Sequence, residues 1–200
     1  MMKPELEASP SQALWCEGWY RYASVLKSPN FGSRPVGGCV DLIVVHSISL
    51  PPGQFGNHNV QRFFTNELDC EAHPYFSNLR DLQVSAHFFI TRAGALWQFV
   101  SCNDRAWHAG QSSYLGRENC NDDSIGIELE GLEGDRFEMS QYETLTGLCA
   151  TLMTNFPIKH IAGHEHIAPG RKADPGPGFD WTRLKNSLAA PSDVFPAPSK

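Results

Sequence analysis

Long apolar runs are missing from this sequence, and so is an excess of positive charge. The longest apolar stretches, such as residues 42–45, are far shorter than the roughly 20 residues that span a bilayer. The first residues hold a lysine followed by acids and prolines, without the apolar centre of a secretory signal. Lys and Arg number 16 against 22 Asp and Glu, and the net charge of −6 disfavours anionic partners. We therefore expect a cytoplasmic protein without a nucleic-acid or membrane partner.

Closely spaced cysteine pairs, the sign of a zinc knuckle or a redox motif, are also lacking. Because no export signal is recognisable, we predict reduced thiols, most of them packing residues, and no disulfides. The sequence contains no Walker A loop, nucleophile elbow or EF-hand loop, and no local signature supports a Cys/His nucleophile. The six cysteines are Cys16, Cys39, Cys70, Cys102, Cys120 and Cys149.

What the sequence does contain suits one globular domain. Its 200 residues include 41% apolar and 19% charged side chains, a balance typical of a packed fold. Strands mixed with helices indicate an α/β (α+β) class with one central sheet. Apolar periodicity and a capping box at residues 140–143 predict helices over 59–66, 140–156 and 180–188. The predicted strands are 40–48, 84–90, 95–100, 124–130 and 160–163, with a hairpin turn at 91–94.

The two ends of the chain differ in composition from its middle. We predict a flexible tail over residues 1–12, one domain over 13–189, and a proline-rich disordered tail over 190–200. Turn-forming residues predict loops over 28–38, 101–123 and 164–178. The last two loops are dense in polar groups, which makes them candidates for function.

Eight histidines are more than a domain of this size needs for packing. His46 ends a buried apolar strand, where an unpaired imidazole is costly. One interpretation is a core histidine bonded to backbone. The other is a metal ligand or catalytic base at the carboxyl end of a strand, where α/β proteins often place their sites.

A second polar cluster follows the last predicted strand. His164 and His166 share one face if the chain is extended there, and Asp174 lies in a loop stiffened by prolines. Two histidines and one carboxylate leave a coordination position open for water, as in catalytic zinc sites. His46, His164 and His166 form a competing triad, and His160 and Glu165 are further candidates.

A zinc hydrolase also needs a base and a cation for the oxyanion. Glu128 and Glu130 share one face of an otherwise apolar predicted strand, where Glu128 is the deeper and Glu130 is expected to be solvated. Lys172 is close to Asp174 in sequence and is either an exposed loop charge or the required cation. Trp107, with His108 beside it, forms either a packed loop aromatic or a wall for a sugar or peptide.

Six strings resemble the zinc-dependent N-acetylmuramoyl-L-alanine amidases, the family that includes amidase-type phage lysozymes and peptidoglycan recognition proteins. The resemblance covers the chain from about Trp15 to Leu188, and it implies a central mixed β-sheet flanked by helices, with one Zn²⁺ in a groove above it. The strings are VVHSISLPPGQFG, AHPYF, VSAHFFI, DRAWHAG, GRENCNDDSIGIELEG and GHEHIAPGRKADPGPGFDW.

The resemblance implies a role for individual residues. It makes His46, His164 and Asp174 the zinc ligands, and His166 a bystander. Glu128 matches the acid that activates the attacking water, and Lys172 matches the residue that stabilises the tetrahedral intermediate. The implied groove residues are Trp107 and Leu129.

Three positions depart from the family pattern. Ser47 follows the first ligand where Asn is usual, and Gln83 and Asn119 stand where arginines contact substrate carboxylates. We expect Ser47 to contact substrate, and Arg117, in the same loop as Asn119, to substitute for a missing arginine.

The implied activity is hydrolysis of the amide between (1,6-anhydro-)N-acetylmuramic acid and L-alanine in muropeptides during peptidoglycan recycling. The expected partner is an anhydromuropeptide, and the expected state is a monomer. The alternatives are a non-catalytic peptidoglycan-binding module on the same fold and an exported amidase that acts on polymeric wall.

Overall fold

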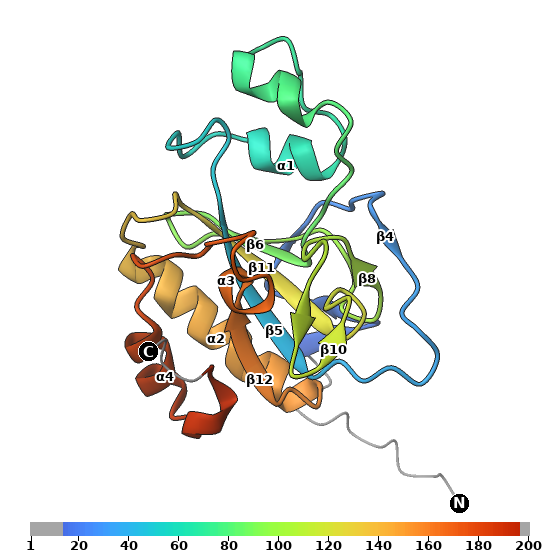
Figure 1. The fold of residues 1–200 in the computed structure, drawn as a ribbon, viewed down its shortest axis with the longest axis vertical. Helices are drawn as coiled ribbons and strands as arrows, with labels where there is room; N and C mark the ends of the chain where they lie inside the picture. The colour runs from blue at the N-terminus through green and yellow to red at the C-terminus, as the bar shows by residue number, and fades with distance from the viewer. Residues whose placement is uncertain (1–13, 197–200) are drawn as a thin grey trace, which may run out of the picture.

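The computed structural model describes residues 14–196, so the predicted tail over 1–12 lies outside the described residues. Its centre is a six-stranded sheet with the strand order β12-β5-β11-β6-β7-β3 (Figure 1). All its neighbouring strands run parallel except β6 and β7, so the sheet is mixed, as predicted. In chain order the strands are β3 (Ser24–Val25), β5 (Leu42–Ile48), β6 (Phe88–Ile90), β7 (Leu96–Gln98), β11 (Ser124–Glu130) and β12 (His160–Gly163).

The two long central strands carry the site. β5 and β11 are rich in Val and Ile and are covered on both faces, which suits parallel strands inside an α/β fold. Their register places Glu128 directly opposite His46. Because both strands run in the same direction, their polar residues meet at one edge of the sheet.

Helices cover the sheet on one face and lie above its carboxyl edge (Figure 1). α2 (Met139–Asn155) packs its buried stripe of Leu145, Leu148, Cys149 and Leu152 on the sheet, together with α4 (Trp181–Leu188). α1 (Asn59–Phe64) and the 3₁₀ helix η2 (Pro74–Leu79) lie beyond the end of β5 over a second apolar cluster. The short α3 (His164–Ile167) directly follows β12.

Three small two-stranded sheets lie outside the central sheet, and two of them fall in predicted loops. They pair β1 (Trp15–Cys16) with β2 (Trp19–Tyr20), β4 (Phe31–Gly32) with β8 (Arg105–Ala106), and β9 (Ser113–Tyr114) with β10 (Arg117–Glu118). The last two pairs order parts of the 28–38 and 101–123 segments. All six cysteines are free, and only Cys102, Cys120 and Cys149 are buried, so half of them rather than most are packing residues.

Three local predictions are wrong. α2 begins one residue before Ser140, and the Glu138 N–H donates to Gln141 Oε1 at 3.0 Å, so the capping pair is not Ser140 and Glu143. The segment after β12 begins as a helix, where a loop was expected. Within the predicted tail over 190–200, where no structure was expected, the 3₁₀ helix η3 (Ser192–Val194) packs the buried Val194 on the core. Within residues 14–196, no helix has the length and apolar character needed to span a membrane.

Candidate metal centre and active site

Three side chains from distant parts of the chain converge at the carboxyl edge of the sheet. His46 lies near the end of β5, His164 begins α3 just after the neighbouring β12, and Asp174 comes from the loop before α4. His46 Nδ1 lies 2.9 Å from His164 Nδ1 and 3.2 Å from Asp174 Oδ2, and His164 Nδ1 lies 3.1 Å from the same oxygen. These three atoms therefore face a common point.

This donor set fits zinc. Two imidazoles and a carboxylate are ligands of catalytic zinc, and bonds of about 2.0–2.1 Å in a tetrahedron separate ligand atoms by about 3.3 Å. The observed separations of 2.9–3.2 Å are close to that spacing. Among residues 14–196, these three side chains form the one His, Cys, Asp and Glu group with ligand atoms near enough to share a metal ion.

The protonation of His46 and Asp174 also suits a cation. Burial lowers the pKa of His46 to about 4, so its imidazole is neutral near pH 7. Burial raises the pKa of Asp174, but its close contacts with His164 and His46 outweigh that effect and hold it well below its usual range. A neutral His46 imidazole and an ionised Asp174 carboxylate are thus available together.

The competing triad with His166 is wrong. Because 164–167 is helical, His166 does not share a face with His164 as it would on an extended chain. Its Nδ1 accepts a hydrogen bond from the Gly163 N–H at 2.9 Å, and its ring packs on Trp181. Neither of the further candidates, His160 and Glu165, joins the ligand group.

Glu128 lies beside the metal ligands on the adjacent strand. Its side chain is only 9% exposed, and burial, reinforced by the negative charge of Asp174, raises its pKa well above the ordinary value. Its buried Oε2 has no hydrogen-bond partner among residues 14–196. An unpartnered carboxylate oxygen in this position is suited to accept a proton from a water molecule in the cleft.

A cleft of about 690 Å³ opens over these groups. Ser47, Trp107, Glu128 and the exposed Lys172 line it, as do His164 and Asp174. One wall is apolar and comes from the segment around α1 and η2, including Leu50, Phe63, Phe64, Leu79 and Val84. The site thus joins a polar floor to an apolar wall, a composition typical of small-molecule sites.

The structure does not bring all the predicted residues to this cleft. Leu129 points into the core and is fully buried, because alternate residues of β11 face opposite sides of the sheet. Arg117 pairs with Asp41 at 2.8 Å and Asp123 at 2.9 Å, beside the starts of β5 and β11 and far from their carboxyl ends. Neither side chain lines the cleft, so the structure gives no support to these two predicted substrate contacts.

Glu130 is another correction. It is 3% exposed, and its carboxylate accepts hydrogen bonds from the Gly56 N–H at 2.6 Å and the Arg92 N–H at 2.9 Å. This residue ties two loops to the end of β11, whereas the sequence pattern predicted a solvated side chain.

Sequence reasoning missed two cleft residues. Arg171, next to Lys172, lines the cleft, and its Nη2 donates to the Ala109 carbonyl at 2.7 Å. His108 was considered only as a possible binding wall, but its Nδ1 lies 2.9 Å from His46 Nε2. The one sequence signal for His108 is its place beside Trp107 in a polar loop.

Known proteins resemble this chain in sequence over most of its length. A family model described as N-acetylmuramoyl-L-alanine amidase matches residues 36–177. The 1,6-anhydro-N-acetylmuramyl-L-alanine amidase AmpD of Citrobacter freundii is 48% identical over 178 residues, which cover 88% of this chain and 95% of that protein.

Solved structures agree with the sequence match. A selenomethionine derivative of AmpD has a TM-score of 0.86 at 47% identity, covering 88% of this chain and 99% of that one. The E. coli N-acetylmuramyl-L-alanine amidase AmiD, solved with anhydro-N-acetylmuramic acid-L-Ala-D-gamma-Glu-L-Lys, has a TM-score of 0.55 at 27% identity, covering 77% and 60%. The chain therefore belongs to the N-acetylmuramoyl-L-alanine amidase family.

Proposed function

We propose that this chain is a zinc-dependent amidase that hydrolyses the bond between (1,6-anhydro-)N-acetylmuramic acid and L-alanine in muropeptides, as part of peptidoglycan recycling. The observation that carries the proposal is the convergence of His46, His164 and Asp174, with Glu128 opposite His46 on the next strand. The similarity to AmpD supports the anhydromuropeptide as substrate.

Each residue has a distinct task in this proposal. His46, His164 and Asp174 hold one Zn²⁺ per chain, which when bound acidifies a water molecule and polarises the scissile carbonyl. Glu128 takes a proton from the attacking water and delivers it to the leaving amine of L-alanine. Its raised pKa suits this double task, because a carboxyl group that holds a proton more readily than usual can also deliver it as an acid.

Lys172 is the proposed electrostatic partner of the oxyanion. It lines the cleft close to Asp174 and Glu128, and its positive charge acts against the rise in the pKa of Glu128. An ammonium here stabilises negative charge that develops on the carbonyl oxygen in the transition state. Its exposed position lets the side chain move onto the substrate.

Ser47 and Trp107 are the proposed substrate contacts. Both line the cleft, and their side chains are only partly buried. An indole ring offers an apolar surface to a sugar or lactyl group, and the hydroxyl of Ser47 offers one donor and one acceptor.

The test is product analysis with and without metal. The purified chain is treated with a chelator, assayed on anhydromuropeptides by mass spectrometry, and assayed again after Zn²⁺ is restored. Release of free peptide that is lost with the metal and regained with it supports the proposal. Unchanged turnover in the metal-free protein contradicts the zinc mechanism, and binding without release supports a non-catalytic peptidoglycan-binding module.

A second arm addresses the site of action. We propose that the chain works in the cytoplasm on recycled fragments, which predicts faster release from anhydromuropeptides than from intact sacculi. Cell fractionation checks the location. Activity mainly in the periplasm, together with rapid cleavage of sacculi, would favour the exported-amidase alternative.

A further inference from the structure

One dipeptide, His108–Ala109, lies against the outer side of both histidine ligands. The His108 ring meets His46 Nε2 at 2.9 Å, and the Ala109 carbonyl oxygen lies 3.0 Å from His164 Nε2. Each of these contacts involves Nε2 of the ligand. The other ring nitrogen, Nδ1, faces the common point of the three ligand atoms, which we call the metal point. A single short segment therefore contacts the rear of both imidazoles.

The hydrogen bonds around His108 determine which of its nitrogens carries the proton. The Ser124 hydroxyl donates to the Cys120 carbonyl, so its oxygen is free to accept from His108 Nε2, 3.1 Å away. His108 therefore has its proton on Nε2 and a bare Nδ1. That bare nitrogen accepts a hydrogen bond from the Nε2–H of His46. The lone pair of His46 Nδ1 is then directed at the metal point.

His164 is oriented in the same way by backbone. A carbonyl oxygen can only accept, so the contact with Ala109 requires the proton on His164 Nε2 and a bare Nδ1. Both ligands are thus held in the tautomer that binds a cation through Nδ1.

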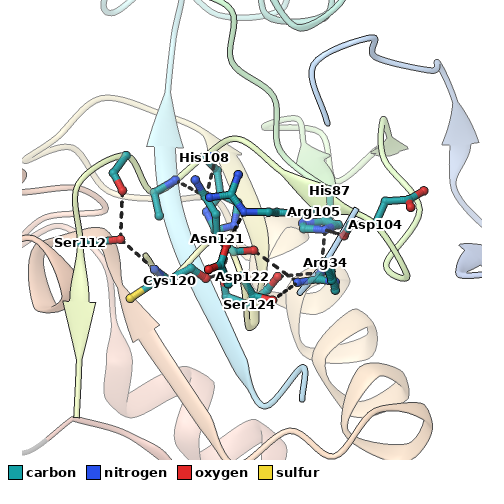
Figure 2. Close-up of polar contacts among 12 residues, drawn as sticks. Arg34, His87, Asp104, Arg105, His108, Ser112, Cys120, Asn121, Asp122 and Ser124 are labelled. Carbon is teal, nitrogen blue, oxygen red and sulfur yellow. Dashed lines mark hydrogen bonds and ion pairs between the residues drawn. The ribbon is translucent and has the colours of Figure 1, made fainter. Parts of the chain in front are cut away.

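The dipeptide is itself fixed by a buried amide. The Asn121 Oδ1 accepts hydrogen bonds from the His108 N–H at 3.0 Å and the Ala109 N–H at 2.8 Å. Figure 2 shows Asn121, Cys120 and Ser124 below His108, with Arg34 beside them. Arg34 donates to the carbonyls of Asn121 and Ser124, which holds the two ends of this support together.

The strand beneath His108 also restricts which residue can lie against its ring. Gly126 of β11 lies against the ring, and a Cβ there would come within 2.4 Å of His108 Cγ. Any larger residue would push the imidazole away from its position. The strand therefore leaves room for this ring between the sheet and His46.

We infer that His108 is a positioning residue that sets the tautomer and direction of His46, with Ser124 and Asn121 as its supports. This inference rests on the proposed zinc site and deepens it, because it names the residues that prepare the ligands. Outer partners of this kind commonly change metal affinity by about 10- to 100-fold when they are removed.

The test is a matched pair of substitutions. Asn and Leu have nearly the same shape, but only Asn places an acceptor oxygen where His108 Nδ1 stands. We expect His108→Leu to weaken zinc binding by about 10- to 100-fold and His108→Asn to retain affinity within a few-fold of the parent. Zinc dissociation constants come from competition with a fluorescent chelator, so the measurement does not depend on amidase activity.

A spectroscopic reading separates orientation from packing. With Co²⁺ as probe, the visible spectrum of His108→Asn should match that of the parent, and that of His108→Leu should shift. Thermal unfolding of the metal-free proteins checks that both variants fold. Thr144→Val is the control, since it removes one side-chain hydrogen bond, to the Gly94 carbonyl, without a link to His46; its zinc affinity should equal that of the parent.

The outcomes distinguish this inference from the proposed function. If the parent binds no zinc, the proposed metal site fails. If the parent binds zinc and both His108 variants bind it equally, whether as tightly as the parent or equally weakly, the positioning role is wrong. Ser124→Ala, which removes the acceptor for His108 Nε2, should give a smaller loss than His108→Leu and no loss if the inference is wrong.

Discussion

The two faces of the central sheet are built from the same strands but differ in the kind of side chain they carry. Towards α2, β5 and β11 present Ile43, Val45, Ile125 and Ile127, all fully buried among apolar side chains. On the opposite face β5 begins with the apolar Leu42 and Val44, but the alternate positions at the carboxyl end of the two strands are polar, as in His46 and Glu128.

The two faces depend on different kinds of interaction. Apolar packing is non-directional and depends mainly on volume. The stability of the α2 face therefore depends on how completely its side chains fill the core. The opposite face depends on which atom donates and which accepts, because a buried polar group without a partner is costly. Substitutions on the two faces should therefore have separable effects on stability and on metal binding.

The largest expected effect is the loss of a ligand on the polar face. Asp174→Ala removes the carboxylate that joins His46 and His164, and we expect zinc affinity to fall by more than about 100-fold, with amidase turnover lost. Zinc content measured by atomic emission after dialysis checks this result. Zinc retained at one ion per chain would show that another side chain completes the site.

The next effect is on turnover alone. Glu128→Gln keeps the shape of the side chain but removes the base, so turnover should fall by about 100- to 10,000-fold while zinc stays bound. Steady-state assays and zinc content are measured on the same sample. Near-parental turnover would remove Glu128 from the proposed role.

A cavity on the apolar face should act on stability and spare the metal. Leu145→Ala empties a fully buried position of α2, and we expect the free energy of unfolding to fall by about 2–5 kcal/mol. Urea unfolding of the metal-free protein measures the loss, and chelator competition measures zinc affinity. A large change in zinc affinity would show that the two faces are coupled.

The smallest predicted effect is a pH dependence of the free energy of unfolding, caused by a buried histidine on the polar face. Burial, reinforced by the charge of Arg34, lowers the pKa of His87 to about 3. The unfolded chain therefore binds a proton near pH 6.5 that the folded chain does not, so stability is lost as pH falls below 6.5 and the loss levels off near pH 3. Between pH 7 and pH 5 this group alone should lower the free energy of unfolding by about 2 kcal/mol.

The comparison variant for this prediction is His87→Asn, which keeps an acceptor for the Gly126 N–H that bonds to His87 Nδ1. It should be less sensitive to pH than the parent over the same range in metal-free protein. An unchanged pH dependence would mean that other buried histidines, such as His46 and His108, account for the whole slope.

Much of the fold followed from local patterns. The predicted strands over 124–130 and 160–163 match β11 and β12 residue for residue, and Asp180 caps α4 through the Arg183 N–H as predicted. Apolar runs, turn residues and caps act over a few neighbouring residues, so they are readable in the sequence.

The site was only partly predictable. His46, His164 and Asp174 were named, but the residues alone left His166 as a competing ligand, and the resemblance to a family favoured Asp174. The short helix α3, which no local sequence pattern predicted, directs His166 away from the metal point. Arg117 and Leu129 were misplaced because loop folding and the side a strand residue faces depend on distant partners.

By itself the sequence determined the strand and helix pattern, the apolar stripe of α2 and the kinds of donor atom available. Only the tertiary structure decided which donors meet: Glu130 is buried because backbone N–H groups 74 and 38 positions away satisfy it, and His108 acts on His46 across 62 positions. Local propensity reaches over a few residues, whereas hydrogen-bond partners and ligands are brought together only when the whole chain packs.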